Sequence, residues 1–164
     1  MRREQGHHPP GGPGRDRQDR ERQQHNPELS SDDKQKILAG DAATIDEVAE
    51  RFAKGLKNLN RTQMRNFYTP FTRIRASRET AERKKAVIQH RARLAYLVAR
   101  EPRAKPIWEL FEGLLKSVGQ EQSANQDKQS NQIDALCDLA EALIAYHYRE
   151  SKSGGGDREQ RLEE

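Results

Sequence analysis

The sequence is poor in the residues that build disulfides, membrane spans and aromatic binding platforms. Its 164 residues include one cysteine, Cys137, and only 5% aromatic residues. A single cysteine excludes an internal disulfide, and no window reaches the roughly 20 apolar residues of a membrane-spanning helix. The basic start of the chain lacks the apolar stretch of a secretory signal. We therefore expect a cytoplasmic protein with no membrane partner.

The motifs of common catalytic sites are also missing. No glycine-rich phosphate-binding loop is present, and the glycine clusters lie near the two ends of the chain. Cys137, His90 and His147 fall on apolar helix faces, where a buried structural side chain is the favoured interpretation. No spacing of Cys, His or carboxylate residues suggests a metal site. The sequence predicts a protein without enzymatic activity, cofactor or metal.

Both ends of the chain have a composition that does not support a packed core. The N-terminal end carries a Pro/Gly cluster followed by charged residues, and the C-terminal end repeats this pattern with three glycines from Gly154. Without apolar periodicity, neither end buries enough surface to offset its ordering entropy. We predict disordered tails over residues 1–31 and 151–164, with one helical bundle domain over residues 32–150.

Within this domain, apolar residues recur at helical spacing, and no alternating strand pattern with hairpin turns is present. We therefore predict an all-α fold, a compact bundle of five to six helices. The spacing predicts helices over residues 44–58, 79–100, 106–119 and 132–150, and a short helix over 32–39. A further helix opens at Thr62, with Met64, Phe67, Phe71 and Ile74 on one side.

Helix starts and interruptions follow from individual residues. Thr44, with Glu47 three residues later, has the spacing of a capping box, and Thr62 is the next expected N-cap. Pro70 lies inside the helix that Thr62 opens. Proline removes a backbone donor and clashes with the preceding turn, so we expect a kink or a break there.

The net charge of +4 hides a strongly basic central segment. Residues 51–105 contain sixteen Lys and Arg against three acids, whereas residues 106–164 contain six against twelve. A local field of this size attracts polyanions. A solvated basic face without a partner is the alternative interpretation, as is a protein–protein adaptor whose basic face meets an acidic partner.

Helical register places the basic side chains of this segment in two exposed rows, one near Arg61 and Arg65 and one on the long helix. Arginine suits phosphate groups because its guanidinium forms paired hydrogen bonds with their oxygens. Apart from Tyr96, the aromatic residues are better explained as core, so stacking on bases is not expected. We predict salt-sensitive, sequence-indifferent binding to the RNA backbone. The residues predicted to bind RNA on this basis are Lys54, Lys57, Arg61, Arg65, Arg73, Arg93 and Arg100.

Three segments in order resemble one family. The segment LNRTQMRNFY at residues 59–68 is similar to the helix-opening segment of small subunits of type III-A CRISPR (Csm) complexes. RLAYLVAR at residues 93–100 resembles their Leu-Ala-Tyr segment, and LAEALIAYH at residues 139–147 resembles their C-terminal helix. Pro70 departs from the family pattern and puts the placement of Arg73 and Arg75 in doubt.

This resemblance implies a non-catalytic helical bundle that stacks in several copies inside a ribonucleoprotein. It implies guide RNA, target RNA and the other subunits of the effector complex as partners. Carried over by position, it implies target-strand contacts for Arg61, Gln63 and Arg65, and less directly for Arg93 and Arg100.

Two alternatives within the RNA-binding class are a small subunit of another CRISPR effector type and a general RNA-coating helical protein. The acidic last two helices lead to a further hypothesis. They could face the basic segment of a neighbouring copy through Glu109, Glu112 and Glu141, which would stack copies head to tail.

Overall fold

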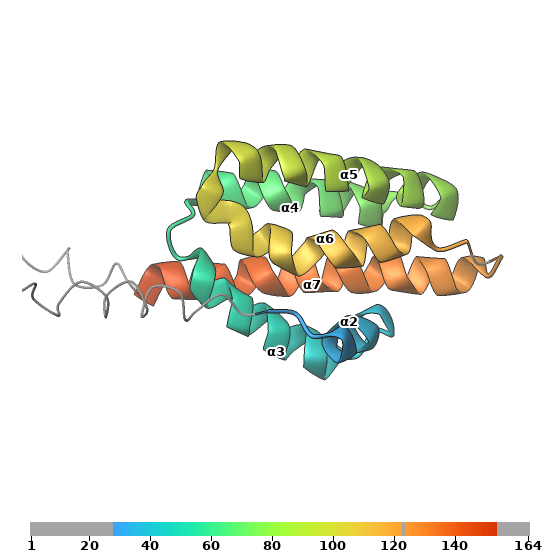
Figure 1. Cartoon of the computed structure of the whole chain (residues 1–164), viewed down its shortest axis with the longest axis horizontal. Helices are drawn as coiled ribbons and strands as arrows, with labels where there is room; N and C mark the ends of the chain where they lie inside the picture. The colour runs from blue at the N-terminus through green and yellow to red at the C-terminus, as the bar shows by residue number, and fades with distance from the viewer. Residues whose placement is uncertain (1–27, 123, 154–164) are drawn as a thin grey trace, which may run out of the picture.

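The computed structural model describes residues 28–122 and 124–153, and within these residues all regular secondary structure is helical, with no strand (Figure 1). The predicted all-α bundle is therefore confirmed. No helix in this part of the chain has the length and apolar character needed to cross a bilayer. The α-helices are α2 (Ser31–Leu38), α3 (Ala42–Ala53), α4 (Arg61–Ala76), α5 (Thr80–Arg100), α6 (Lys105–Gln120) and α7 (Gln126–Ser153), with short 3-10 helices η1 (Lys54–Leu56) and η2 (Pro102–Ala104).

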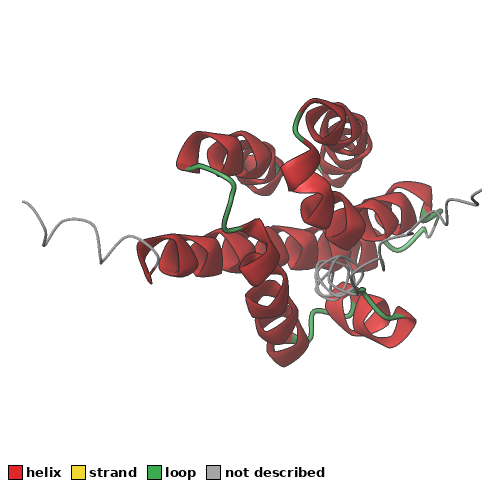
Figure 2. Ribbon diagram, turned by 60° about the vertical axis from the view of Figure 1, so that its left-hand side comes forward, coloured by secondary structure: helices red, strands yellow, loops and turns green. Residues whose placement is uncertain are grey.

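Helix α7 is the longest element, and each of the other five α-helices packs on it. Figures 1 and 2 show it running the length of the bundle, with α2 and α3 on one side and α4, α5 and α6 on the other. It presents apolar residues at helical spacing, and these are fully buried because the surrounding helices cover them from several directions. They include Ile133, Leu136, Leu139, Ala140 and Leu143.

The predicted bounds of α7 were too short at its start, because the helix begins at Gln126 instead of residue 132. The Gln- and Asn-rich residues before 132 were expected to form a loop or a weak helical lead-in. They are helical, with Asn125 Oδ1 accepting from the backbone N–H of Lys128 (3.0 Å) at the first turn. This cap satisfies one of the donors that a helix start leaves unpaired.

The predicted N-cap of α3 was also wrong by one turn. Gly40 adopts a positive φ of 80° after α2, and Asp41 then caps α3 by accepting from the backbone N–H of Thr44 (3.0 Å). Thr44 lies inside the helix, and its hydroxyl donates to the same Asp41 carboxylate (2.5 Å). The short helix expected at residues 32–39 is present as α2.

Helix α4 starts two residues earlier than predicted, because Asn60 and not Thr62 is its N-cap. Asn60 Oδ1 accepts from the backbone N–H of Gln63 (2.9 Å), and Gln63 Oε1 accepts from the backbone N–H of Asn60 (2.8 Å). This reciprocal capping box satisfies two donors at once. The extended backbone at Asn60 places the start of the helix there.

The break expected at Pro70 does not occur, since α4 is helical from Arg61 to Ala76. Phe67 and Phe71, which flank the proline, are both buried, and their rings pack edge to face at 5.4 Å. Burial of large side chains on both sides holds the helix together across the missing hydrogen bond.

The core is centred on an aromatic cluster between α4, α5 and α6. The rings of Phe67, Phe71 and Phe111 lie 5.2–5.4 Å apart, and the His90 ring meets Phe71 edge to face at 4.6 Å. Cys137 of α7 is buried next to this cluster, with its sulfur 3.7 Å from the carbonyl oxygen of Phe71. Burial raises the pKa of the thiol, in keeping with the predicted structural role.

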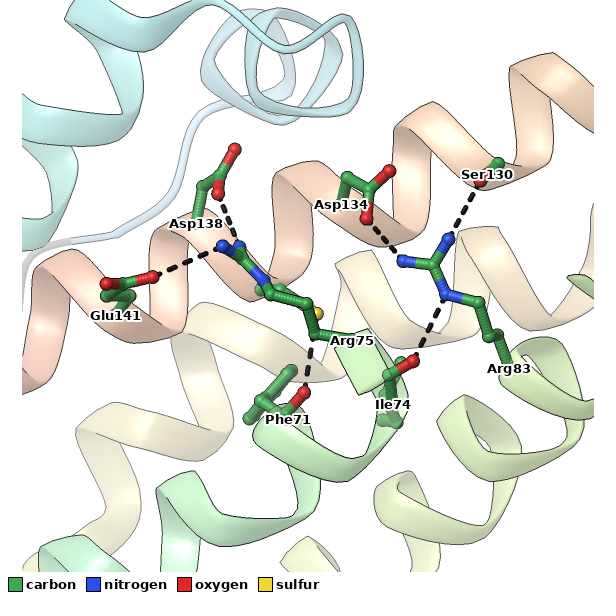
Figure 3. A network of polar contacts seen from close by, with 9 residues as sticks. Phe71, Ile74, Arg75, Arg83, Ser130, Asp134, Asp138 and Glu141 are labelled. Carbon is green, nitrogen blue, oxygen red and sulfur yellow. Dashed lines mark hydrogen bonds and ion pairs between the residues drawn. The ribbon is translucent and has the colours of Figure 1, made fainter. Parts of the chain in front are cut away.

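Two arginines from the basic segment tie α4 and α5 to α7 (Figure 3). Arg83 is 5% exposed and donates to the carbonyl oxygen of Ile74 (3.1 Å), to Ser130 Oγ (2.8 Å) and to the Asp134 carboxylate. Arg75 pairs with Asp138 and with Glu141 (3.3 Å) one and two turns further along α7. These arginines therefore act as internal ties between helices.

The tails predicted over residues 1–31 and 151–164 lie mostly outside the described residues. Where the described region meets them, Leu29 is buried against the core, and α7 extends to Ser153.

Replacing the helix cap distinguishes the two possible starts of α4. We expect Asn60→Ala to lower the free energy of unfolding by about 1 kcal/mol, because the backbone N–H of Gln63 loses its side-chain acceptor. Thr62→Ala, at an exposed position inside the first turn, should have a much smaller effect. Urea unfolding followed by circular dichroism measures both. A larger loss for Thr62→Ala would contradict the capping box.

Replacing the buried arginine tests the tie to α7. Arg83→Met should lower the free energy of unfolding by about 3 kcal/mol, because it leaves a carbonyl, a hydroxyl and a carboxylate without their donor. Arg78→Met is the matched control at an exposed position in the same α4–α5 connection, and its effect should stay within about 0.5 kcal/mol. If the two variants lowered the free energy of unfolding equally in denaturant, Arg83 would not stabilise the packing of α5 on α7.

Candidate nucleic-acid interface

The positive charges of residues 51–105 divide into two groups. Seven form ion pairs within the chain, namely Arg51, Lys57, Arg75, Arg83, Arg91, Arg103 and Lys105. Lys84 donates to the backbone carbonyl of Glu121. Among the described residues the remaining eight make no ion pair, namely Lys54, Arg61, Arg65, Arg73, Arg78, Lys85, Arg93 and Arg100. The field available to an external polyanion comes mainly from this second group.

A groove between α4 and α5 brings three of these arginines together. Its larger part, about 450 Å³, is lined by Arg93, Arg100, Tyr96 and Gln63 among others. A second part of about 320 Å³ is lined by Arg73 and again by Arg93. The two parts share Asn66, Arg93 and Leu97, so they form one continuous groove, hereafter the α4–α5 groove.

Tyr96 is the one large aromatic side chain in the groove that is open to solvent, with 64% of its surface exposed. Arg100 lies one turn later, donates to the Tyr96 hydroxyl (3.3 Å) and places its guanidinium 5.7 Å from the ring centre. The expectation that Tyr96 lies outside the core and beside Arg93 and Arg100 is met. This pair offers a cation and a π face at one position.

The end of the larger part is closed by an acid and an amide that are already engaged. Glu101 accepts from Arg103 (2.6 Å) and from Gln63 Nε2 (2.6 Å). The bond from Arg103 is the main cause that lowers the pKa of Glu101 to about 2, so this carboxylate stays ionised. Both ends of the Gln63 amide have partners, since Gln63 Oε1 caps α4. An RNA contact by Gln63 would have to share these bonds.

Three of the predicted residues lie together at another place, near the C-terminal end of α7. Lys57 pairs with Glu150 of α7 (3.5 Å), and the Arg61 guanidinium lies 4.6 Å from the centre of the Tyr148 ring. Lys54, on η1, is exposed. Arg65 is exposed on α4 and lines neither part of the groove. The predicted set is therefore split between the groove and the bundle end.

One groove residue had no sequence signal. Asn66 lines both parts of the groove, but an isolated exposed asparagine on a helix is unremarkable in sequence. Its relevance appears only when α5 is packed beside α4. For Arg75 and Arg83 the signal in the sequence was misleading. Their charge resembles that of the groove arginines, but both pair with carboxylates of α7.

The acids named for head-to-tail stacking are engaged inside the chain. Glu109 pairs with Lys105 (3.5 Å), Glu112 with Arg91 (2.5 Å) and Glu141 with Arg75 (3.3 Å). Stacking of copies through these acids stays a prediction, and each acid would have to exchange or share its internal partner to take part in it.

His90 is the buried polar residue beside the groove. It is 3% exposed, it lines the part next to Pro70, and neither ring nitrogen has a hydrogen-bond partner. Burial, aided by the nearby Arg93, lowers its pKa from 6.5 to about 4, so the ring is neutral at physiological pH. The second buried histidine, His147, is different, because its Nε2 donates to the carbonyl oxygen of Leu59 (3.0 Å).

These features define an all-helical protein with a solvent-accessible groove between α4 and α5 that is lined by arginines. The family model described as Csm2 Type III-A matches residues 39–153. Because the match spans more than half of the chain, the chain belongs to this family, the small subunits of the type III-A CRISPR complex. The resemblance seen in the three sequence segments is thereby confirmed. Searches of curated proteins and of solved structures returned no significant match.

The pKa of His90 predicts how stability depends on pH. The folded protein binds this proton more weakly than the unfolded chain, so stability is lost as the pH falls from about 6.5 towards about 4. We expect the free energy of unfolding to be roughly 2 kcal/mol lower at about pH 5 than at neutral pH. In His90→Phe, which keeps an aromatic ring, most of this difference should disappear. Equal pH dependence of the two proteins in urea unfolding would contradict the assignment.

Proposed function

We propose that this small subunit is a non-catalytic, RNA-binding structural component of the type III-A complex. The observation that carries the proposal is the α4–α5 groove, where Arg73, Arg93 and Arg100 lie without carboxylate partners among the described residues. Seven other basic side chains of the same segment are neutralised within the chain, and three of the eight that remain line the groove.

The chemistry of the groove favours a phosphate backbone over an acidic protein surface. Guanidinium groups in a row bind successive phosphates with paired hydrogen bonds, and the gain comes largely from release of counterions. Lys54, Arg61 and Arg65 add exposed cations outside the groove, and Lys57 would have to exchange its partner Glu150 to join them. In this proposal sequence specificity comes from pairing of guide RNA with target RNA, and the protein holds the strand.

The partners in this proposal are the guide RNA and the target RNA, the other subunits of the effector complex, and further copies of this chain stacked along the duplex. Its place would be the cytoplasm. The carboxylate of Glu101, at the end of the groove, is already engaged by Arg103 and Gln63, and Cys137 is buried away from solvent.

The groove arginines can be tested against a neighbour of equal charge. We expect Arg73→Ala with Arg93→Ala to weaken single-stranded RNA binding roughly tenfold or more, because two charge-assisted contacts are lost. The slope of log affinity against log salt should fall by about 1.4. Filter binding over a series of salt concentrations measures both quantities.

Arg75→Ala is the matched control, since Arg75 lies on the same helix two residues from Arg73 and is paired with Asp138 and Glu141. Its RNA affinity and salt slope should match those of the natural protein. A double variant with unchanged affinity, or a loss of equal size in Arg75→Ala, would rule out the groove as the binding surface.

A further inference from the structure

The part of the α4–α5 groove next to Pro70 differs from the rest because buried polar groups there lack partners. We call it the Pro70 recess, lined by Asn66, Phe67, Thr69, Pro70, Arg73, His90, Arg93, Leu94 and Leu97. His90 is 3% exposed, and both its Nδ1 and its Nε2 are buried without a hydrogen bond. Leaving such groups unpaired is costly, so a ligand that supplies partners is favoured.

Pro70 removes a backbone donor at the same place. Proline has no backbone N–H, so it cannot donate to the carbonyl oxygen of Asn66 one turn earlier in α4. Asn66 lines the recess and also carries a side-chain amide with both donor and acceptor atoms. The proline and the unpaired histidine therefore face one cavity from two different helices.

The remaining lining separates the recess into an apolar interior and a cationic rim. Phe67, Leu94 and Leu97 provide the apolar surface, and Phe67 and Leu94 are fully buried. Arg73 and Arg93 provide the charge, and neither makes an ion pair among the described residues. A ligand that uses the whole site needs a flat or apolar body, polar edge atoms and an adjacent anion.

A nucleotide has all three features. A bare phosphate would use only the arginines and leave the histidine and the apolar walls unused. The volume of about 320 Å³ is large enough for one base. We propose that the Pro70 recess takes up one unpaired nucleobase of the bound RNA, with the flanking phosphates on Arg73 and Arg93. This inference rests on the proposed RNA-binding function and adds a base contact to it.

The protonation state of His90 fits this role. Its pKa of about 4 keeps the imidazole neutral, so the ring offers one donor and one acceptor. Base edges carry both donors and acceptors, so one nitrogen of the neutral ring can meet one polar atom of a base edge. Because the walls are apolar and contact is limited to one base, the site adds affinity while discriminating only weakly between bases.

The test compares two RNA strands of equal length and equal phosphate number, one natural and one with abasic riboses. We expect the full chain to bind the natural strand roughly tenfold more tightly, a difference that base contacts alone supply. In His90→Phe the two affinities should lie within about twofold, because the polar partner is lost and the recess is partly filled. Gln89→Ala, the exposed neighbour on α5, should keep the full difference.

Asn66→Ala provides a second variant at an exposed position and decides the outcome if His90→Phe does not unfold cooperatively. It should reduce the preference for the natural strand while leaving the salt slope unchanged. If both strands bind with equal affinity and normal salt dependence, the recess is not a base site, although the RNA-binding proposal survives. If Arg73→Ala with Arg93→Ala changes neither affinity, the groove is not the binding surface and the base site fails with it. If neither strand binds, the proposed function fails as well.

Discussion

The structure depends on the packing of every other helix against α7. Fully buried side chains such as Leu136, Leu139 and Leu143 meet residues from helices far apart in the sequence, and each contributes about 1.5–3 kcal/mol by leaving water. Polar ties reinforce this packing at its edge, where Arg83 reaches Asp134 and Ser130 (Figure 3). Because α4 and α5 are both held to α7, the groove between them has a fixed shape.

The same packing sorts the positive charge of the chain. Arg73 and Arg75 are two residues apart on α4 and therefore point to different sides of the helix. Arg75 meets Asp138 and Glu141 of α7, whereas Arg73 lines the groove with Arg93. The acids of α7 neutralise the arginines that lie beside them, and those that line the groove keep their charge for a polyanion.

Two local irregularities meet at the groove. Pro70 inside a helix and an unpaired histidine in the core each go against the ordinary preferences of folded chains. The burial of Phe67 and Phe71 compensates for the first by holding α4 together. Irregularities that persist in one place and open into one cavity are typical of functional sites, where local stability is given up for binding.

Periodicity and composition determined the helical fold, the family resemblance and the basic segment, because each is a property of residues near one another in the chain. Only the tertiary structure decided which cations are free. Arg75 and Arg83 look like Arg73 and Arg93 in sequence. Arg75 and Arg83, however, pair with acids of α7 that lie about fifty to seventy positions later in the chain, whereas Arg73 and Arg93 line the groove. Packing also decided that α4 continues through Pro70 and that Asn66 and His90 share one recess, since burial on both sides of the proline outweighs the missing hydrogen bond.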